Sequence, residues 1–176
     1  QCLIDHGLKL KPSKCNFFHN KITYLSHRVS AEGIQPAEDN LEPIAAVSPP
    51  STYTEIHSFL GLVGHYRHFI KLFTQIAWPL TDMLLGEGSN KKKEKVELHE
   101  EVMESFCQLR LACLKAPVLA YPDYEKPFLL EMDASGRALG AVLLQKQDCR
   151  RYHPVVYGSR TLNNHEQNYH LTKQEF

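Results

Sequence analysis

The chain has 176 residues, enough for one large domain or two small ones, and 43% of them are hydrophobic, which suffices to fill a core. Twenty basic and twenty acidic side chains give a net charge of zero, so composition shows none of the positive excess typical of nucleic-acid-binding domains. No apolar run approaches the roughly 20 residues of a membrane span, and the N-terminus has no signal-peptide pattern.

The five cysteines are odd in number and scattered, and none forms a Cys-x-x-Cys pair. This usage predicts reduced thiols in an intracellular protein rather than a disulfide framework, and it disfavours a zinc site. The positions are Cys2, Cys15, Cys107, Cys113 and Cys149.

The first part of the chain reads as a hairpin followed by a helix. Residues 14–18 and 22–29 are apolar or alternating and are split by three polar residues, which predicts two short antiparallel strands closed by Gly33. Residues 36–47 then carry apolar side chains at spacings of three and four, with Pro36 near the first turn, as in a helix.

A more apolar helix is predicted next. Thr52 and Glu55 have the spacing of a capping box, and apolar residues continue at helical spacing as far as residue 70. Gly61 and Gly64 lie within this helix and lower its propensity, so they indicate that another backbone packs closely against it.

The second half changes from helices to strands. Helices are predicted over 74–85, with a kink near Pro79, and over 99–114, with a charged linker at 86–95 between them. Three apolar runs then predict strands, joined by loops short enough for antiparallel pairing, and the first reads as a strand covered on both faces. From about residue 161 the pattern is helical again. The three runs are 128–132, 139–144 and 154–158.

Asp133 follows the first of these runs and precedes the small residues Ala134, Ser135 and Gly136. A carboxylate at a strand end suits Mg²⁺, which takes hard oxygen donors. The same residue also fits a β-turn, in which the side chain bonds the backbone. Residue type and position leave both interpretations open.

Glu175 stands three residues after Thr172, which is again the spacing of a capping box. The carboxylate therefore either returns a bond to the Thr172 backbone or serves as a ligand. Both interpretations place it in the first turn of a helix, facing the N-terminus of that helix.

Polar residues between 65 and 71 give a second group of candidates. His65 and His68 share a helix face, which fits a metal pair and also fits packed polar residues. Tyr66, Arg67 and Lys71 fit phosphate contacts, with the Tyr66 ring available for stacking, and equally fit a solvated helix edge. No phosphate-cradling glycine loop or nucleophile elbow occurs, so nothing supports nucleophilic catalysis by Ser or Cys.

Several short strings occur in a characteristic order and spacing over nearly the whole chain. Examples are Lys14-Cys15, Tyr24-Leu25-Ser26-His27, Phe59-Leu60-Gly61-Leu62, Ala116-Pro117-Val118-Leu119, Asp133-Ala134-Ser135 and Gly140-Ala141-Val142-Leu143. Together they resemble the C-terminal part of the reverse transcriptase of long-terminal-repeat retroelements of the Ty3/gypsy type.

The resemblance implies an α+β architecture made of four parts. Residues 1–35 would be the end of the polymerase palm with the primer-grip β-hairpin, and 36–83 would be the helical thumb. Residues 84–123 would connect them to 124–176, the N-terminal part of a ribonuclease H-like fold. That last part would be truncated, with three antiparallel strands and the start of a helix.

The resemblance also implies roles for single residues, and it overrides the cap and turn interpretations of the two carboxylates. Asp133 and Glu175 would be catalytic and would bind Mg²⁺ for hydrolysis of the RNA strand of an RNA–DNA hybrid. The primer-grip and nucleic-acid-binding residues would be Tyr24, Leu25, Ser26, His27, Tyr66, Arg67 and Lys71. Ser26 stands where the family usually has glycine, which puts close backbone approach there in doubt.

We therefore expect a fragment of a retroelement Pol protein whose parent binds an RNA–DNA hybrid or a template-primer, away from membranes, in the cytoplasm, nucleus or a virus-like particle. The oligomeric state is left open. The palm carboxylates and the later ribonuclease H aspartates are absent from the sequence, so we expect the free chain to catalyse neither reaction. The alternatives are a domesticated, non-catalytic module that binds nucleic acid or protein, and a degenerate reading frame.

Overall fold

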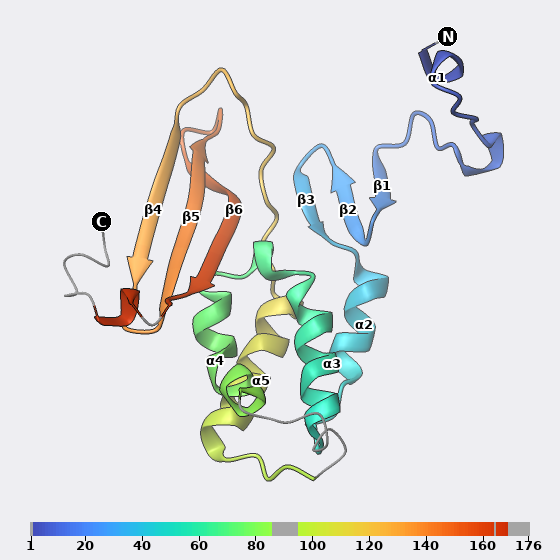
Figure 1. Ribbon diagram of the computed structural model, residues 1–176. Coiled ribbons are helices and arrows are strands. Elements are labelled where there is room, and N and C mark those ends of the chain that lie inside the picture. Colours follow the sequence, from blue (N-terminus) through green and yellow to red (C-terminus); the bar gives the residue numbers. More distant parts are fainter. Residues whose placement is uncertain (1, 86–94, 164, 169–176) are drawn as a thin grey trace.

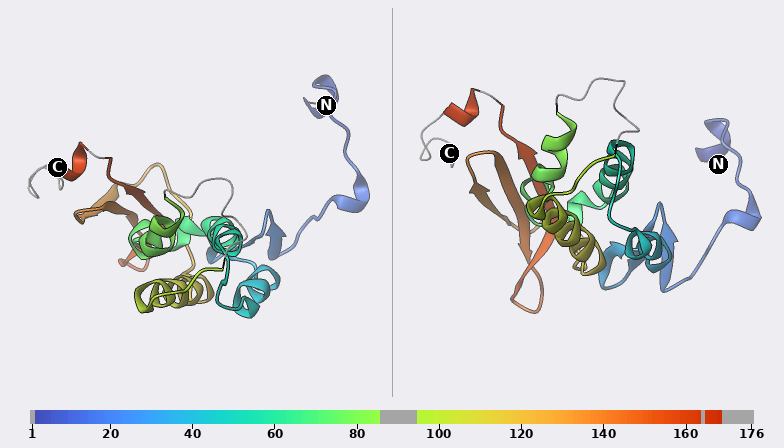
Figure 2. Two further views of the ribbon diagram at one scale, coloured as in Figure 1. Left: turned by 60° about the horizontal axis from the view of Figure 1, so that its bottom comes forward. Right: turned by 90° about the horizontal axis from the view of Figure 1, so that it is seen from below.

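The computed structural model describes residues 2–85, 95–163 and 165–168. Figure 1 shows a bundle of helices with a small three-stranded sheet on one side and a longer three-stranded sheet on the other, and Figure 2 shows the same arrangement from two further directions. The predicted α+β class with antiparallel sheets is confirmed. Within the described part of the chain, no helix combines the length and apolarity needed to cross a bilayer.

The first sheet is an antiparallel meander, preceded by the short helix α1 and the 3₁₀ turn η1. The predicted strand at 14–18 is wrong, because this segment contains the end of η1 and no strand. The predicted strand at 22–29 is folded into a hairpin instead. The elements are α1 (Cys2–Asp5), η1 (Pro12–Lys14), β1 (Lys21–Tyr24), β2 (His27–Ser30) and β3 (Gly33–Pro36).

The hairpin turn explains why its sequence looked like one strand. Tyr24 pairs with His27, so Leu25 and Ser26 alone form the turn, and both have positive φ angles, 47° and 67°. Turns of this kind usually carry Asn-Gly or Asp-Gly, which are the residues that mark a hairpin in a sequence. Leu-Ser gives no such signal, so the alternating pattern ran on through the turn.

Four helices and a short 3₁₀ turn form the bundle. They are α2 (Glu38–Ala46), α3 (Tyr53–Gly64), η2 (Arg67–Phe69), α4 (Phe73–Leu84) and α5 (Glu100–Leu114). Their apolar faces share one core, in which the rings of Phe59 and Phe106 lie 4.6 Å apart. The segment expected to act as a connection therefore includes a helix, α5, that helps to build this core.

The predicted helical faces are largely confirmed, but one boundary is not. Thr52 Oγ1 accepts a hydrogen bond from the Glu55 amide at 3.3 Å, as a cap should, while the Glu55 carboxylate accepts from the Ser51 amide at 2.6 Å. The helix expected to reach residue 70 ends at Gly64 and gives way to η2. The expected apolar face of α5 is buried at Val102, Phe106, Leu109 and Cys113.

The second sheet has the three predicted antiparallel strands, in the order β4-β5-β6. They are β4 (Phe128–Ala134), β5 (Ala138–Lys146) and β6 (Tyr152–Thr161), and the 3₁₀ turn η3 (Glu166–Asn168) follows. The expectation that the first strand is covered on both faces is wrong among the described residues. There β4 is an edge strand with Leu130 56% and Met132 62% exposed.

A buried glutamine holds the loop that leads into β4. Gln145 is fully buried, and its amide accepts a hydrogen bond from the Asp123 backbone N–H at 2.8 Å. The same amide donates to the backbone oxygens of Asp123 and Lys126 at 2.7 and 3.1 Å. Its polar atoms are thus paired, as a buried amide requires, and they fix the point at which β4 begins.

Replacing Ser26 by glycine is expected to stabilise the protein. The left-handed conformation costs a residue with a side chain roughly 1–2 kcal/mol, whereas the extra backbone entropy of glycine costs roughly 0.5–1 kcal/mol. The free energy of unfolding, measured by urea denaturation, should rise by about 0.5–1 kcal/mol. Ser30→Gly within β2 is the control and should lower it. A loss of stability in Ser26→Gly would contradict the turn described above.

Candidate nucleic-acid interface and carboxylate site

The segment that joins α3 to α4 packs on the second sheet through Ser159 of β6. Arg67 Nη2 donates a hydrogen bond to the Ser159 backbone oxygen at 2.6 Å. The Thr74 amide donates to Ser159 Oγ at 3.1 Å, and the two hydroxyl oxygens lie 2.9 Å apart. These bonds connect residues that are more than 80 positions apart, so they fix the sheet against the bundle.

Leu72 completes this contact by packing onto a glycine of β5. Its φ angle is 56°, which turns the chain sharply before α4. A Cβ added to Gly140 would lie 2.2 Å from Leu72 Cδ2, so glycine leaves the space that the leucine fills. Gly140 pairs with Asp133 on β4, and the bundle therefore meets the sheet beside the candidate carboxylate.

Asp133 lies on the face of the sheet that is turned toward this contact. It and Glu131 pair with Gly140 and Val142, and residues two apart on a strand project from the same face. Both carboxylates border a hollow of about 220 Å³ that Lys71 also lines. The hollow thus has acidic residues on the strand side and a basic residue on the bundle side.

Carboxylate oxygens are the donors that Mg²⁺ prefers, so the chemistry of Asp133 and Glu131 fits this ion. Within the ranges that the structure describes, no group of three or more metal-ligating side chains gathers, so these two are fewer than a two-ion centre needs. Glu175 lies outside the described residues, and so does its expected approach to Asp133.

The tip of the first hairpin packs against the end of α3. The His27 ring lies 5.3 Å from the His65 ring and 5.4 Å from that of Phe69, and its Nδ1 pairs with the Leu25 oxygen at 2.7 Å. Tyr24 and Leu25, in contrast, are 64% and 70% exposed. The histidine anchors the tip to the bundle, and the residues before it are presented to solvent.

The outer face of α3 is open. A Cβ built on Gly61 or on Gly64 would meet no described atom within 4 Å beyond the adjoining backbone of its own helix. The expectation that these glycines accommodate another backbone is therefore not met by the described part of this chain. His57 on this helix and His65, directly after its end, are both exposed, four residues to either side of Gly61.

Two of the expected nucleic-acid-binding residues, Tyr66 and Arg67, have contacts within the protein. Tyr66 is only 3% exposed, so its ring is not available to stack on a base, which corrects that expectation. Arg67 is exposed and donates to the Ser159 oxygen, and His68 Nδ1 lies 3.3 Å from the Tyr157 oxygen. These residues follow the end of α3, where the chain leaves the helical path that the sequence pattern predicted.

A capping box that sequence reasoning missed begins at Asn163. Asn163 Oδ1 accepts a hydrogen bond from the Glu166 amide, and a Glu166 carboxylate oxygen accepts one from the Asn163 amide, both at 2.8 Å. Arg160 donates to both carboxylate oxygens, at 2.7 and 2.8 Å. Arg160, followed by the Asn163 backbone, lowers the pKa of Glu166 to about 2. The Asn-x-x-Glu spacing was the signal that could have revealed it.

Comparison with known proteins identifies the class. Residues 98–176 match the family described as "RNase H-like domain found in reverse transcriptase". The chain is 40% identical over 174 residues to the Pol polyprotein of transposon 297 and 37% identical over 181 residues to that of transposon gypsy, both from Drosophila melanogaster. It is 30% identical over 175 residues to the Tf2-3 polyprotein of Schizosaccharomyces pombe.

These alignments cover 98%, 99% and 99% of the chain but 15%, 17% and 13% of the relatives, so the chain spans a small part of their length. The fold is similar to that of the foamy viral protease-reverse transcriptase. The TM-score is 0.73 against the structure in complex with double-stranded DNA and 0.74 against that with an RNA/DNA hybrid. The sequence identities are 21% and 20%, over 88% and 93% of this chain and 31% and 21% of those chains.

The chain is thus homologous to a segment of the Pol polyproteins of gypsy and related long-terminal-repeat transposons, and it carries an RNase H-like domain of the reverse-transcriptase kind. The resemblance stated from the sequence is confirmed.

Removing the Ser159 hydroxyl is expected to loosen the sheet from the bundle. In Ser159→Ala the partly buried Thr74 amide loses its acceptor, which should lower the free energy of unfolding by about 1–2 kcal/mol and accelerate hydrogen exchange of that amide. Ser58→Ala, at an exposed site on α3, should change stability by less than about 0.5 kcal/mol. Unchanged exchange at Thr74 in Ser159→Ala would refute the proposed contact.

The stability of the 3₁₀ turn η3 and of the cap at its start is expected to depend on pH. The pKa of Glu166 is about 2 in the folded chain against an ordinary 4.5, so its stabilising contribution is complete above about pH 4.5 and is lost as the pH falls toward 2. Carbon-detected NMR of the Glu166 carboxyl should give this low midpoint, and Arg160→Gln should raise it toward 4.5. Arg137→Gln removes an arginine that lies over the Trp78 ring and should leave the midpoint unchanged.

Proposed function

We propose that this chain is the part of a retroelement reverse transcriptase that holds the template-primer and supplies the first carboxylates of the ribonuclease H site. The observation that carries the proposal is that Asp133 lies one residue before the end of the first strand of an antiparallel sheet, inside the region that matches the RNase H-like family. In this proposal residues 1–35 are the end of the palm, 36–83 are the thumb, and 84–123 are the connecting segment, whose helix α5 packs in the core of the bundle. Residues 124–176 belong to the ribonuclease H-like domain.

Nucleic acid is the proposed ligand of the hairpin tip and of the outer face of α3. The exposed Tyr24 and Leu25, with Ser26 and His27 behind them, are suited to grip a primer end. The open space over Gly61 and Gly64 allows a nucleic-acid backbone to approach the helix closely. Support comes from the foamy viral structures of similar fold, which were determined with double-stranded DNA and with an RNA/DNA hybrid.

Asp133 and Glu175 are the proposed catalytic carboxylates. With Mg²⁺ bound, such a pair would supply activation of water and stabilisation of charge for hydrolysis of the RNA strand. Asp133 and its neighbour Glu131 give the described residues two carboxylates at the hollow, whereas two ions roughly 4 Å apart require more ligands. We therefore expect the 176-residue chain to bind a hybrid without cutting it.

Gly61→Leu is the test of the nucleic-acid interface. Leucine is a better helix former than glycine, and its Cβ meets no described atom within 4 Å, so the free energy of unfolding should rise by about 0.5–1 kcal/mol. The same side chain would obstruct a nucleic-acid backbone, so affinity for a fluorescent 20-base-pair RNA–DNA hybrid, measured by anisotropy, should fall at least about tenfold, the equivalent of 1.4 kcal/mol.

Cys107→Ala, at an exposed site on α5, is the matched control and should leave the affinity unchanged. Affinity of the unaltered chain should also fall steeply with salt, as phosphate contacts require. Absence of any hybrid binding would refute the proposed function. Binding that Gly61→Leu leaves unchanged would remove α3 from the interface. Cutting of the hybrid by the purified chain in Mg²⁺ would refute the expected inactivity.

A further inference from the structure

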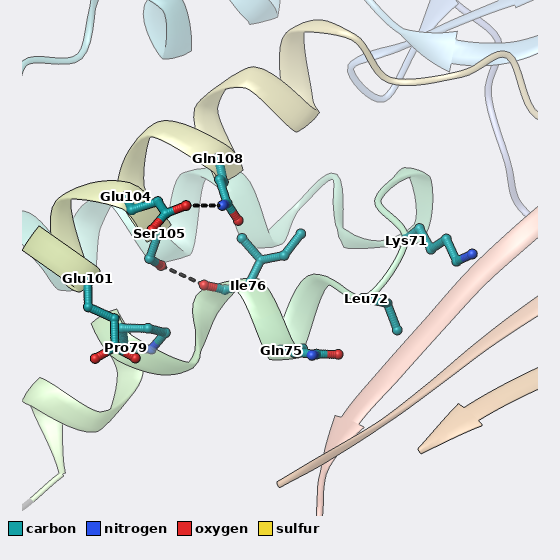
Figure 3. A pocket seen from close by; sticks show the side chains of 9 residues that line it. All are labelled: Lys71, Leu72, Gln75, Ile76, Pro79, Glu101, Glu104, Ser105 and Gln108. Atoms are coloured by element: carbon teal, nitrogen blue, oxygen red, sulfur yellow. Dashed lines mark hydrogen bonds between the residues drawn. The ribbon is translucent and has the colours of Figure 1, made fainter. Parts of the chain in front are cut away.

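Lys71 stands at the junction of the bundle and the second sheet. It lines two hollows, and Leu72 lines both of them as well. One is a groove of about 400 Å³ between α4 and α5, and the other is the hollow beside Asp133. Figure 3 shows Lys71 and Leu72 at the end of the groove that faces the strands, with Glu101 and Pro79 toward its other end. The charged residues that line this groove are Lys71, Glu101 and Glu104, and of these the lysine lies closest to the strands that carry the candidate carboxylate site.

The position of Lys71 is fixed by its neighbours in the chain. Leu72, the next residue, turns the backbone with a φ angle of 56° and inserts against Gly140, the strand partner of Asp133. Two residues further on, Thr74 is hydrogen-bonded to Ser159. The Lys71 backbone therefore cannot leave the sheet unless these contacts break, while the ammonium group has the long, flexible stem of a lysine.

The charges around the hollow are unequally divided. Glu131 and Asp133 line it from β4, and Lys71 is its basic lining residue. Among the ion pairs of the described residues, none within 4 Å involves Lys71, so its charge is not neutralised by a fixed partner there. Two carboxylates repel a phosphate, and an ammonium group across the hollow offsets that repulsion.

We propose that Lys71 binds a phosphate of the nucleic-acid strand that lies at Asp133, so that the helical bundle supplies a positioning residue to the carboxylate site. This inference rests on the proposed function, because it requires a nucleic-acid strand at the hollow. It adds that the strand is held from two directions, by the sheet and by the turn before α4. A movement of the bundle relative to the sheet would then misplace the strand at the carboxylates.

The test measures binding of the 176-residue chain to a fluorescent 20-base-pair RNA–DNA hybrid over a range of salt concentrations. In Lys71→Ala the affinity should fall several-fold at low salt, and the slope of log affinity against log salt should shrink by about 1, the effect of one lost phosphate contact. Lys71→Arg keeps the charge and should restore most of the slope. Lys146 lies at the end of β5, about 20 Å along the strand from Gly140, the residue that pairs with Asp133. Lys146→Ala makes the same charge change and should have no effect.

A double-mutant cycle with Asp133→Asn tests whether the two residues serve the same stretch of strand. If they do, the effects of Lys71→Ala and Asp133→Asn on hybrid affinity should not add, whereas those of Lys146→Ala and Asp133→Asn should add. An unchanged salt slope in Lys71→Ala, or additive effects with Asp133→Asn, would overturn the inference and leave the proposed function standing. Failure of the unaltered chain to bind the hybrid would refute both.

Discussion

The placement of the second sheet on the helices depends on one contact, in which the turn between α3 and α4 and the first turn of α4 are bonded to β6 and packed on β5. Arg67 and Thr74 bond Ser159, and Leu72 occupies the space that Gly140 leaves. Backbone and hydroxyl groups in this contact are paired with each other instead of with water, which makes its geometry directional. Through it, the position of Asp133 is defined relative to the helices as well as within its own sheet.

The sequence was most informative where periodicity reports burial. The buried face of α5, the cap at Thr52 and the three strands of the second sheet follow from spacing alone. Periodicity failed where a residue adopts a conformation that its type does not favour. Leu25 and Leu72 both have positive φ angles, and neither marks a turn in a sequence. The apolar run of β4 was misread because apolar composition alone does not say whether a neighbour covers it.

In the candidate site, too, the sequence indicated some features and missed others. Asp133 was open to two interpretations from its residue type and position, and only the resemblance to the retroelement family favoured a metal ligand; the structure puts it beside a hollow. Tyr66 was taken for a surface residue because the helical pattern was extended past Gly64, whereas it is buried in the core. Arg67 is exposed as expected, and its bond to Ser159 of the sheet could not be foreseen from a local pattern. The role proposed for Lys71 at the carboxylate site depends on Asp133, about 60 positions away, so no local pattern could have indicated it.

The segment between α5 and β4 has a further consequence for how such a chain can vary. The Ile34 and Leu119 amides each donate to the other residue's carbonyl oxygen, at 2.9 and 2.8 Å, and the Ala120 amide donates to the Pro154 oxygen at 2.8 Å. Consecutive residues are thereby held by both sheets at once. An inserted or deleted residue here would shift the register on both sides, whereas the exposed turn at 148–151 has room for changes of length. Chains related to this one should therefore differ in length at the turn of residues 148–151 and keep a constant length between Pro117 and Tyr121.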